Sequence, residues 1–222
     1  MVKLSIIIPL APGEKEWEDL ILKLPMNAEI ILAHSLGEKP PVISCTMLQK
    51  RIVVIAARAG RGSQMNAGSE RASGDYLWFL HADSRFDDDS ISALLASIRK
   101  YPDSLLFFDL AFIKVKKWPM CVNEIGAKIR SNLLKIPFGD QGFCMKKVVF
   151  DRIGQFRTDV EYGEDHLLTW QAKKHGVSIK AIQAKLFTSP RKYQKYGWLR
   201  ITMLYQFLWL RQAFGALCLR QR

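Results

Sequence analysis

Residues 75–84 form the first place where the chain indicates chemistry. The run reads Asp-Tyr-Leu-Trp-Phe-Leu-His-Ala-Asp-Ser, so an apolar segment stops at His81 and Asp83. In open α/β sheets, ligands bind outside the carboxyl ends of the strands, and a carboxylate there suits a hard divalent cation, which prefers oxygen ligands. Asp is also a good helix N-cap. Asp83 alone therefore fits either a metal ligand or a cap for the helix expected from about position 87.

A second stretch, residues 57–68, combines glycines with arginines after another expected strand. Glycines permit close approach of the backbone to a ligand. A helix N-terminus with Arg58 and Arg61 nearby favours a phosphate group. Glycine-containing loops between a strand and a helix are common, however, and this one matches neither a P-loop nor a dinucleotide-binding fingerprint.

Two further polar segments complete the set. Residues 137–142 read Pro-Phe-Gly-Asp-Gln-Gly, a turn-prone sequence, while Glu164 and Asp165 stand at the start of an expected helix. Adjacent carboxylates at this position interact favourably with the helix dipole. They equally suit a general base that deprotonates a hydroxyl nucleophile. The residues by themselves leave both interpretations open.

The spacing of apolar residues predicts the elements that must position these side chains. Strands are expected at 4–9, 29–33, 51–55, 76–80 and 105–115, and helices at 14–24, 62–72 and 88–100. This alternation predicts an α/β fold, with a mostly parallel central sheet and helices on both faces. The loops at the carboxyl ends of the strands are then expected to converge.

The carboxy-terminal half adds a helix at 123–134, whose apolar residues share one face: Ile125, Ile129, Leu133 and Leu134. A short strand at 143–146, a helix at 164–175 that ends at Gly176, and a strand at 178–182 are expected to follow. Residues 196 onward read as an amphipathic helix. Because internal repeats and linkers are absent, we expect one domain at 1–195 and a basic amphipathic helix at 196–222.

The composition fits a single domain of 222 residues with 49% hydrophobic content and a sizeable core. The amino-terminal residues read as a strand rather than a leader, and polar residues interrupt the apolar stretch 198–219, so we expect no membrane span. The cysteines lack metal or redox spacing, which predicts reduced thiols and a cytoplasmic protein. They are Cys45, Cys121, Cys144 and Cys218.

The net charge of +12 is concentrated near the carboxyl end. From His166 to Arg222 there are 11 basic and no acidic residues, while the other 165 residues hold 22 basic and 21 acidic ones. This asymmetry predicts an anionic partner, although a solvated basic face explains most of these residues equally well. No nucleic-acid recognition module is present, so we expect no nucleic-acid partner. The tail fits peripheral binding to an anionic lipid surface at the inner face of the membrane, or packing on the domain or on a second subunit of a homodimer.

The order of these segments resembles the family 2 glycosyltransferases of the GT-A fold. Six pieces stand in the family's order, at 4–9, 60–68, 74–84, 137–142, 164–165 and 189–191. The likeness is closest to a small subgroup, some members of which are associated with arsenosugar biosynthesis. In that subgroup the runs Gly-Arg-x-x-Gln-Met-Asn-x-Gly, Phe-Leu-His-Ala-Asp and Pro-Phe/Tyr-Gly-Asp-Gln-Gly recur together, as they do here at 60–68, 79–83 and 137–142.

The resemblance implies inverting transfer of a sugar from a nucleotide-sugar donor to a hydroxyl acceptor, assisted by Mg²⁺ or Mn²⁺. It implies that Asp165, with Glu164 beside it, is the catalytic base, and that Asp83 holds the cation against the donor diphosphate. His81 either ligates the metal or is hydrogen-bonded at the strand end. The implied donor-binding residues are Pro9, Arg58, Arg61, Asn66, Asp83 and Arg191. The implied acceptor-binding residues are Gly139, Asp140, Gln141 and Gly142.

Two segments depart from the family's pattern, both on the nucleotide side of the expected site. Many relatives carry an Asp directly after the second strand, where this chain has Ala33-His34-Ser35-Leu36. The polar Asn-Glu that commonly follows the first strand's proline is replaced by residues 10–14. An alternative hypothesis is therefore a degenerate GT-A domain that binds a partner or a membrane without catalysis.

Overall fold

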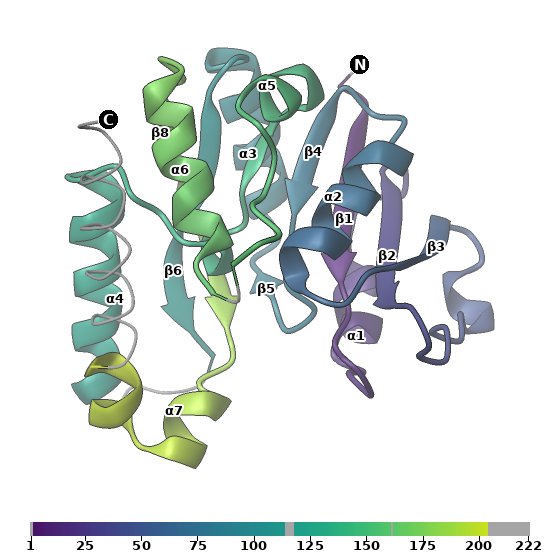
Figure 1. The fold of residues 1–222 in the computed structure, drawn as a ribbon, viewed down its shortest axis with the longest axis horizontal. Coiled ribbons are helices and arrows are strands. Elements are labelled where there is room, and N and C mark those ends of the chain that lie inside the picture. The colour runs from purple at the N-terminus through teal and green to yellow at the C-terminus, as the bar shows by residue number, and fades with distance from the viewer. Residues whose placement is uncertain (1, 114–117, 161, 204–222) are drawn as a thin grey trace.

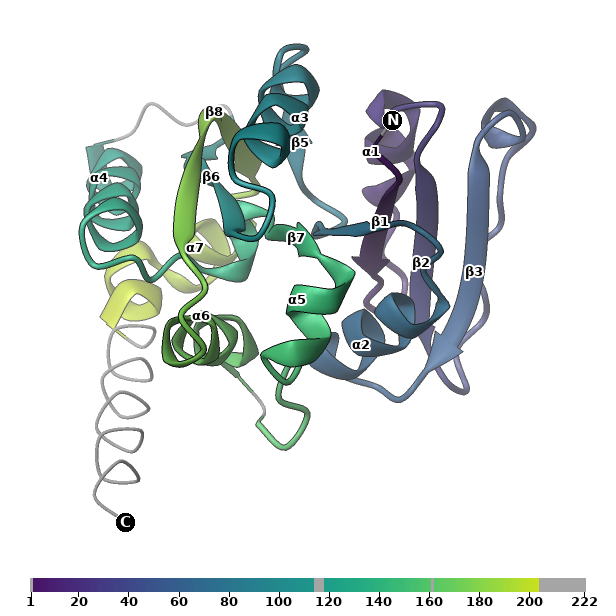
Figure 2. The ribbon, with the colours of Figure 1, turned by 90° about the horizontal axis from the view of Figure 1, so that it is seen from above.

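The computed structural model describes residues 2–113, 118–160 and 162–203 (Figure 1). Within these residues an eight-stranded sheet runs through the molecule in the order β3-β2-β1-β4-β7-β6-β8-β5. Helices lie on both faces of this sheet, as Figure 2 shows. The predicted α/β architecture is therefore confirmed.

One half of the sheet is parallel and consists of β3 (Arg51–Ala57), β2 (Glu29–Ser35), β1 (Leu4–Pro9) and β4 (Tyr76–Phe79). Every residue of β1 is buried, because its alternating side chains enter two separate cores. Ile6 and Ile8 join one core and Ile7 the other. A strand that is covered on both faces is expected to be continuously apolar.

The two cores assign the helices to faces. Helices α1 (Trp17–Lys23) and α3 (Ser90–Lys100) contribute Leu20, Ile21 and Leu94 to the first core. Helices α2 (Arg61–Arg71), α5 (Lys147–Arg152) and α6 (Glu164–Lys174) pack on the opposite face. Gly68 lets α2 approach closely, since a Cβ atom there would lie 2.5 Å from Ile7 Cγ2.

The other half of the sheet mixes directions. The short strand β7 (Cys144–Lys146) is antiparallel to both β4 and β6 (Leu105–Phe112). Strand β6 pairs in parallel with β8 (Ile179–Thr188), and β5 (Arg85–Phe86) lies at the edge. The remaining described elements are η1 (Cys45–Met47), η2 (Gly139–Gln141), α4 (Trp118–Asn132), α7 (Arg191–Tyr196) and a helical stretch at 198–203.

Most expected elements are present, with shifted ends. β1 has the predicted bounds, while β6 ends earlier than expected and its register with β8 shifts between Phe108 and Asp109. Strand β8 is twice as long as predicted, with 10 residues, and continues to Thr188. Most of the expected carboxy-terminal helix, residues 204–222, lies outside the described residues. Among the described helices, none has the length and apolar content that crossing a membrane requires.

Helix α4 differs from the expected pattern in the direction of its apolar face. Ile125 and Ile129 do share one face of α4, but that face is exposed to solvent. Leu133 and Leu134, expected on the same helix, lie past its end at Asn132 and are also exposed. The side of α4 that packs against the protein carries Met120, Ala127 and Ser131 instead. Periodicity therefore identified the helix correctly without revealing which side the protein covers.

Candidate active site

Asp83 follows β4 at the carboxyl end of the strand and links it to the end of β8. Its half-buried carboxylate accepts hydrogen bonds at Oδ2 from Thr188 Oγ1, at 3.4 Å, and from the Ser189 N–H, at 3.3 Å. The cap interpretation is wrong, because α3 begins at Ser90 and has Asp89 as its N-cap residue. Asp83 is thus a carboxylate at the sheet edge where ligands are expected.

Asp165 lies in the first turn of α6, directly against the loop that contains η2. Its Oδ2 accepts the Gly139 N–H at 2.7 Å, and its Oδ1 accepts the His166 N–H, also at 2.7 Å. Ring atom Nδ1 of His166 lies 3.3 Å from the same Oδ1. Burial alone would raise the pKa of Asp165, but His166, the Arg61 charge and the Gly139 N–H hold it below its usual range. Asp165 is therefore a fixed, ionised carboxylate.

The predicted catalytic and acceptor segments meet at Gly139. A Cβ atom on Gly139 would lie 3.2 Å from Asp165 Cβ and 3.5 Å from His81 Nε2. The loop after β4, η2 and the start of α6 therefore lie next to one another at Gly139. A side chain at this position would thus be in tight contact with Asp165.

Asp140 is the carboxyl group of this cluster whose hydrogen bonding is incomplete. Its Oδ1 atom is buried and has no hydrogen-bond partner among the described residues. Burial raises the pKa of Asp140 to about 6, with Arg130 lowering it and Asp165 raising it. Asp140 can therefore change its protonation state close to neutral pH, while Asp165 stays ionised.

Gln141, by contrast, uses its whole side chain inside the protein. Oε1 accepts hydrogen bonds from Ser131 Oγ at 2.7 Å and from the Phe138 N–H at 3.1 Å, and Nε2 donates to the Phe108 carbonyl at 2.9 Å. The amide is fully buried. Gln141 thus fixes the loop 137–142, and its expected role in binding an acceptor stays a prediction.

Sequence reasoning missed Arg130, which supports the same loop from α4. Its guanidinium carbon lies 3.3 Å from the centroid of the Phe138 ring, and its Nε donates to the Ile136 carbonyl at 3.0 Å. Its charge also acts on Asp140 and Asp165. No local pattern distinguishes Arg130 from the other basic residues of that segment.

The two predicted phosphate-binding arginines differ in their surroundings. Arg61 is the first residue of α2, and its Nε forms an ion pair with Glu164 Oε1 at 2.9 Å. Burial raises the pKa of Glu164, and the Arg61 charge opposes this rise. This pair joins the N-terminus of α2 to that of α6. Arg58 is exposed in the loop before α2. Arg191, at the start of α7, forms an ion pair with Glu16 and is more than half exposed.

Three other expected site residues have clear structural contacts. Asn66 pairs with the Phe156 backbone in both directions, at 2.9 and 3.1 Å, so its amide is used within the protein. Pro9 is buried at the end of β1. Gly142 has a φ of 63°, and a Cβ atom there would lie 2.8 Å from Leu186 Cδ2, so the turn requires glycine.

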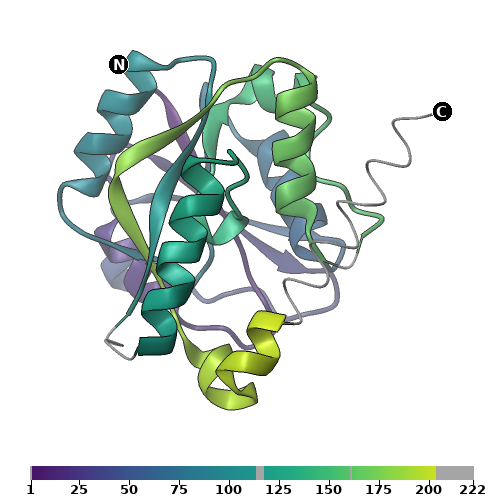
Figure 3. The same ribbon diagram turned by 90° about the vertical axis from the view of Figure 1, so that its left-hand side faces the viewer.

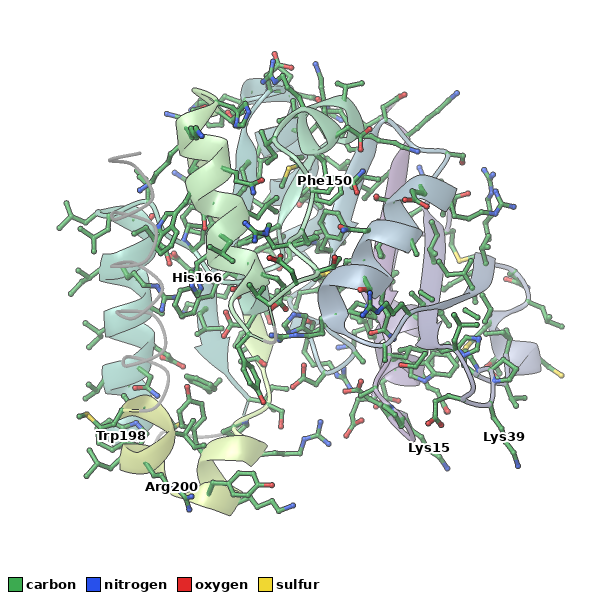
Figure 4. All side chains as sticks on the ribbon, in the orientation of Figure 1. Lys15, Lys39, Phe150, His166, Trp198 and Arg200 are labelled. Atoms are coloured by element: carbon green, nitrogen blue, oxygen red, sulfur yellow. The ribbon has the colours of Figure 1, made fainter. Side chains whose placement is uncertain are left out.

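A cavity of about 550 Å³ lies beside the carboxyl ends of β1 and β2. His34 and Ser35 line it at the place where the sequence lacks a carboxylate, and Lys15 and Lys39, both labelled in Figure 4, also line it. Gln64, which sequence reasoning also missed, donates from Nε2 to the carbonyls of Leu10 and Ala33, both at 2.9 Å. It ties the two strand ends that border this cavity, and its only sequence signal was its place in the run 60–68.

The protein's own side chains provide few metal ligands at this site. Among the described residues, no three or more His, Cys, Asp or Glu side chains are grouped so that they could hold a metal ion. Mg²⁺ is commonly held by one or two carboxylates plus substrate phosphates. Asp83 at the strand end fits such a cation, provided that a phosphorylated ligand completes the coordination.

A sequence model of the family described as glycosyl transferase family 2 matches residues 26–158, more than half of the chain. The chain belongs to glycosyltransferase family 2. No curated protein sequence matches it significantly. The family assignment agrees with the resemblance of the sequence to this family.

Solved structures show that the fold of this glycosyltransferase family 2 chain is GT-A. TarS from S. aureus is 13% identical, with a TM-score of 0.61 over 84% of this chain and 36% of that chain. TarS 1–349 in complex with UDP-GlcNAc is 15% identical, with a TM-score of 0.61 over 84% of this chain and 58% of that chain. Mannosyltransferase PcManGT from Pyrobaculum calidifontis, in complex with GDP-Man and Mn²⁺, is 15% identical, with a TM-score of 0.60 over 84% of this chain and 56% of that chain. The chain spans less than two thirds of the length of each of these proteins.

Proposed function

We propose that the chain is an inverting glycosyltransferase that moves a sugar from a nucleoside-diphosphate sugar to a hydroxyl acceptor. The contact between Asp165 and Gly139, at 2.7 Å, carries this proposal. It joins the residue that the family resemblance implies as the base to the loop implied for the acceptor. A degenerate domain has no need to keep a base, an acceptor loop and the Asp83 strand end together.

The donor would lie along the carboxyl ends of β1 and β2. The cavity lined by His34 and Ser35 is large enough for a nucleoside, and drug-sized ligands commonly occupy cavities of this size. Arg58, Arg61 and the N-terminus of α2 would attract the diphosphate, with Arg191 on the other side. The complexes of the similar proteins with UDP-GlcNAc and GDP-Man support a nucleotide-sugar donor.

Mg²⁺ or Mn²⁺ would be held by Asp83, with His81 as a second ligand or as a hydrogen-bonded neighbour. When bound, the cation neutralises negative charge on the leaving nucleoside diphosphate. Asp83 is anchored by Thr188 and Ser189, so its carboxylate is oriented before any ligand binds. The Mn²⁺ in the PcManGT complex supports a cation in this role.

The acceptor hydroxyl would lose its proton to Asp165 as its oxygen attacks the anomeric carbon. Attack on the face opposite the leaving diphosphate inverts the configuration at that carbon. The hydrogen bonds from Gly139 and His166 fix the orientation of the Asp165 carboxylate, which is what a positioned base needs. Asp140, whose Oδ1 lacks a partner among the described residues, would bind an acceptor hydroxyl nearby. Glu164 would hold Arg61 in place.

The finer assignments also remain proposals. The three runs at 60–68, 79–83 and 137–142 support membership of the subgroup associated with arsenosugar biosynthesis. We further propose a catalytic domain at 1–195 and a basic amphipathic helix at 196–222, in a cytoplasmic protein. In an alternative arrangement this helix packs on the second subunit of a homodimer.

The test is release of nucleoside diphosphate from a panel of UDP-, GDP- and dTDP-sugars with Mn²⁺. We expect release from one donor class, lost in Asp83→Ala and kept in Asp103→Ala, the same change at an exposed carboxylate. Titration calorimetry with the same donors shows whether a silent panel reflects absent binding or a missing acceptor. A well-folded protein that binds no nucleotide sugar would contradict the proposal.

The second candidate is a GT-A domain that binds a partner without catalysis. The cavity wall at His34 and Ser35, where relatives carry a carboxylate for the nucleotide base, favours it. This candidate predicts that calorimetry detects no nucleotide binding and that neither the wild-type protein nor Asp165→Asn turns over a donor. Turnover that is lost in Asp165→Asn, with folding intact, would exclude it.

A further inference from the structure

Helix α4 turns a row of large apolar side chains toward solvent. Their exposed fractions are 41% for Val122, 60% for Ile125, 55% for Ile129 and 75% for Leu133. Val122, Ile125 and Ile129 are spaced by three or four positions and so lie on the same side of α4. Leu133 lies just past the end of the helix at Asn132 and continues the row, since its N–H donates to the Ile129 carbonyl at 2.8 Å. An apolar row of this length on a soluble protein usually marks a site of interaction.

The helical stretch 198–203 lies beside α4 and exposes further apolar groups. Asn123 Nδ2 donates to Thr202 Oγ1 at 3.5 Å, and Figures 1 and 3 both show the two segments next to each other. Leu199 and Met203 are 63% and 62% exposed, while Ile201 is buried and anchors the stretch. We call the four residues of the α4 row together with Leu199 and Met203 the α4 surface.

Two basic and two acidic residues lie near the α4 surface, and both acidic side chains are engaged within the protein. Lys128 is 68% exposed beside the row, and Arg200, labelled in Figure 4, extends outward from the 198–203 stretch. The acidic residue of α4, Glu124, uses its carboxylate to accept the Phe112 N–H at 2.8 Å. Asp109 pairs with Lys128 at 3.7 Å. From residue 166 to the end of the sequence there is no Asp or Glu.

We propose that the α4 surface docks on an anionic lipid bilayer. Exposed aliphatic side chains flanked by basic groups are typical of helices that lie in the membrane interface, because the side chains enter the acyl boundary while the cations contact the head groups. The proposal concerns binding only and stands whether or not the chain transfers a sugar.

Vesicle flotation of the full chain tests this docking. We expect the protein to float with vesicles of phosphatidylglycerol and phosphatidylcholine, and to stay at the bottom with phosphatidylcholine alone. Ile129→Asp is expected to reduce the floated fraction about tenfold, because it places a carboxylate in the acyl boundary. Leu48→Asp is the matched control, since Leu48 is 70% exposed at the β3 end of the sheet and lies outside the α4 surface.

Circular dichroism and thermal unfolding establish that both variants are folded, as expected for exposed positions. Three results would overturn the proposal. The first is that the wild-type protein stays unbound with anionic vesicles. The second is that Ile129→Asp floats as well as Leu48→Asp, which would assign lipid binding to another part of the chain. The third is that light scattering finds a dimer which Ile129→Asp alone converts to a monomer, because a second copy would then cover this surface.

Discussion

Replacing Gln141 with leucine tests whether this buried amide holds the loop 137–142 in place. Leucine has a similar volume but provides no hydrogen bonds. The change therefore leaves the Phe138 N–H and the Phe108 carbonyl without their partner, and it removes the acceptor of the Ser131 hydroxyl, which is fully buried.

The expected loss of stability follows mainly from these three bonds, because the fourth, from Arg130 Nη2 to Gln141 Oε1, is longer at 3.4 Å. Each contributes about 1 kcal/mol net, and a buried donor or acceptor left unsatisfied costs about 1–3 kcal/mol. Burial of the leucine side chain offsets part of the loss. We expect the free energy of unfolding to fall by about 3 kcal/mol. For a domain of 150–250 residues this corresponds to a decrease in Tm of about 6–12 °C.

Urea unfolding followed by circular dichroism measures this change. Gln49→Leu, the same substitution at an exposed position, is the matched control and is expected to unfold within about 0.5 kcal/mol of wild type. A Gln141→Leu protein as stable as that control, with an unchanged m-value, would show that the amide does not hold the loop. A large loss in both variants would point to a general effect of the substitution.

Three further changes test the pairs and close contacts around the site. Arg61→Ala leaves the buried Glu164 unpaired, so we expect a loss of about 2 kcal/mol at pH 7. Burial raises the pKa of Glu164, so this loss should shrink as the pH falls and the carboxyl group takes up a proton; a loss in urea unfolding that does not change with pH would contradict this. Burial raises the pKa of Asp140 to about 6, so its ionisation lowers stability as pH rises from about 4 through 6. Asp140→Asn is therefore expected to gain stability relative to wild type over that range, and a constant difference in metal-free buffer would be the opposing result. Gly62→Ala places a Cβ atom 2.8 Å from the Arg157 carbonyl, and thermal unfolding should show a loss of about 1–3 kcal/mol rather than wild-type stability.

The sequence predicted the parts of the fold that local pattern controls. Strand β1 has the expected bounds because both of its sides are buried, which produces a continuous apolar run. The contact of Gly139 with Asp165 agrees with the rule that loops converge at the carboxyl edge of a sheet. Strand β8 was predicted too short because its second half carries exposed and partly buried residues, such as Lys185, beyond the register shift.

Other features of the site depend on contacts between distant residues. Gln64 reaches carbonyl groups 54 and 31 positions away, and Arg130 supports a ring and a carbonyl of the next loop. No spacing rule identifies such contacts before the chain is folded. The apolar row of α4 was visible in the sequence, but periodicity does not say whether the protein, a second copy or a lipid surface covers it.

Turnover by Asp165→Asn, with the donor that the panel identifies, tests the central claim most directly. Asparagine keeps the size of the side chain and removes its basicity. We expect kcat to fall by about 10²–10⁴-fold, with donor binding by calorimetry unchanged and with Asp103→Asn equal to wild type. Turnover of Asp165→Asn at the wild-type rate would contradict the assignment of this carboxylate as the base.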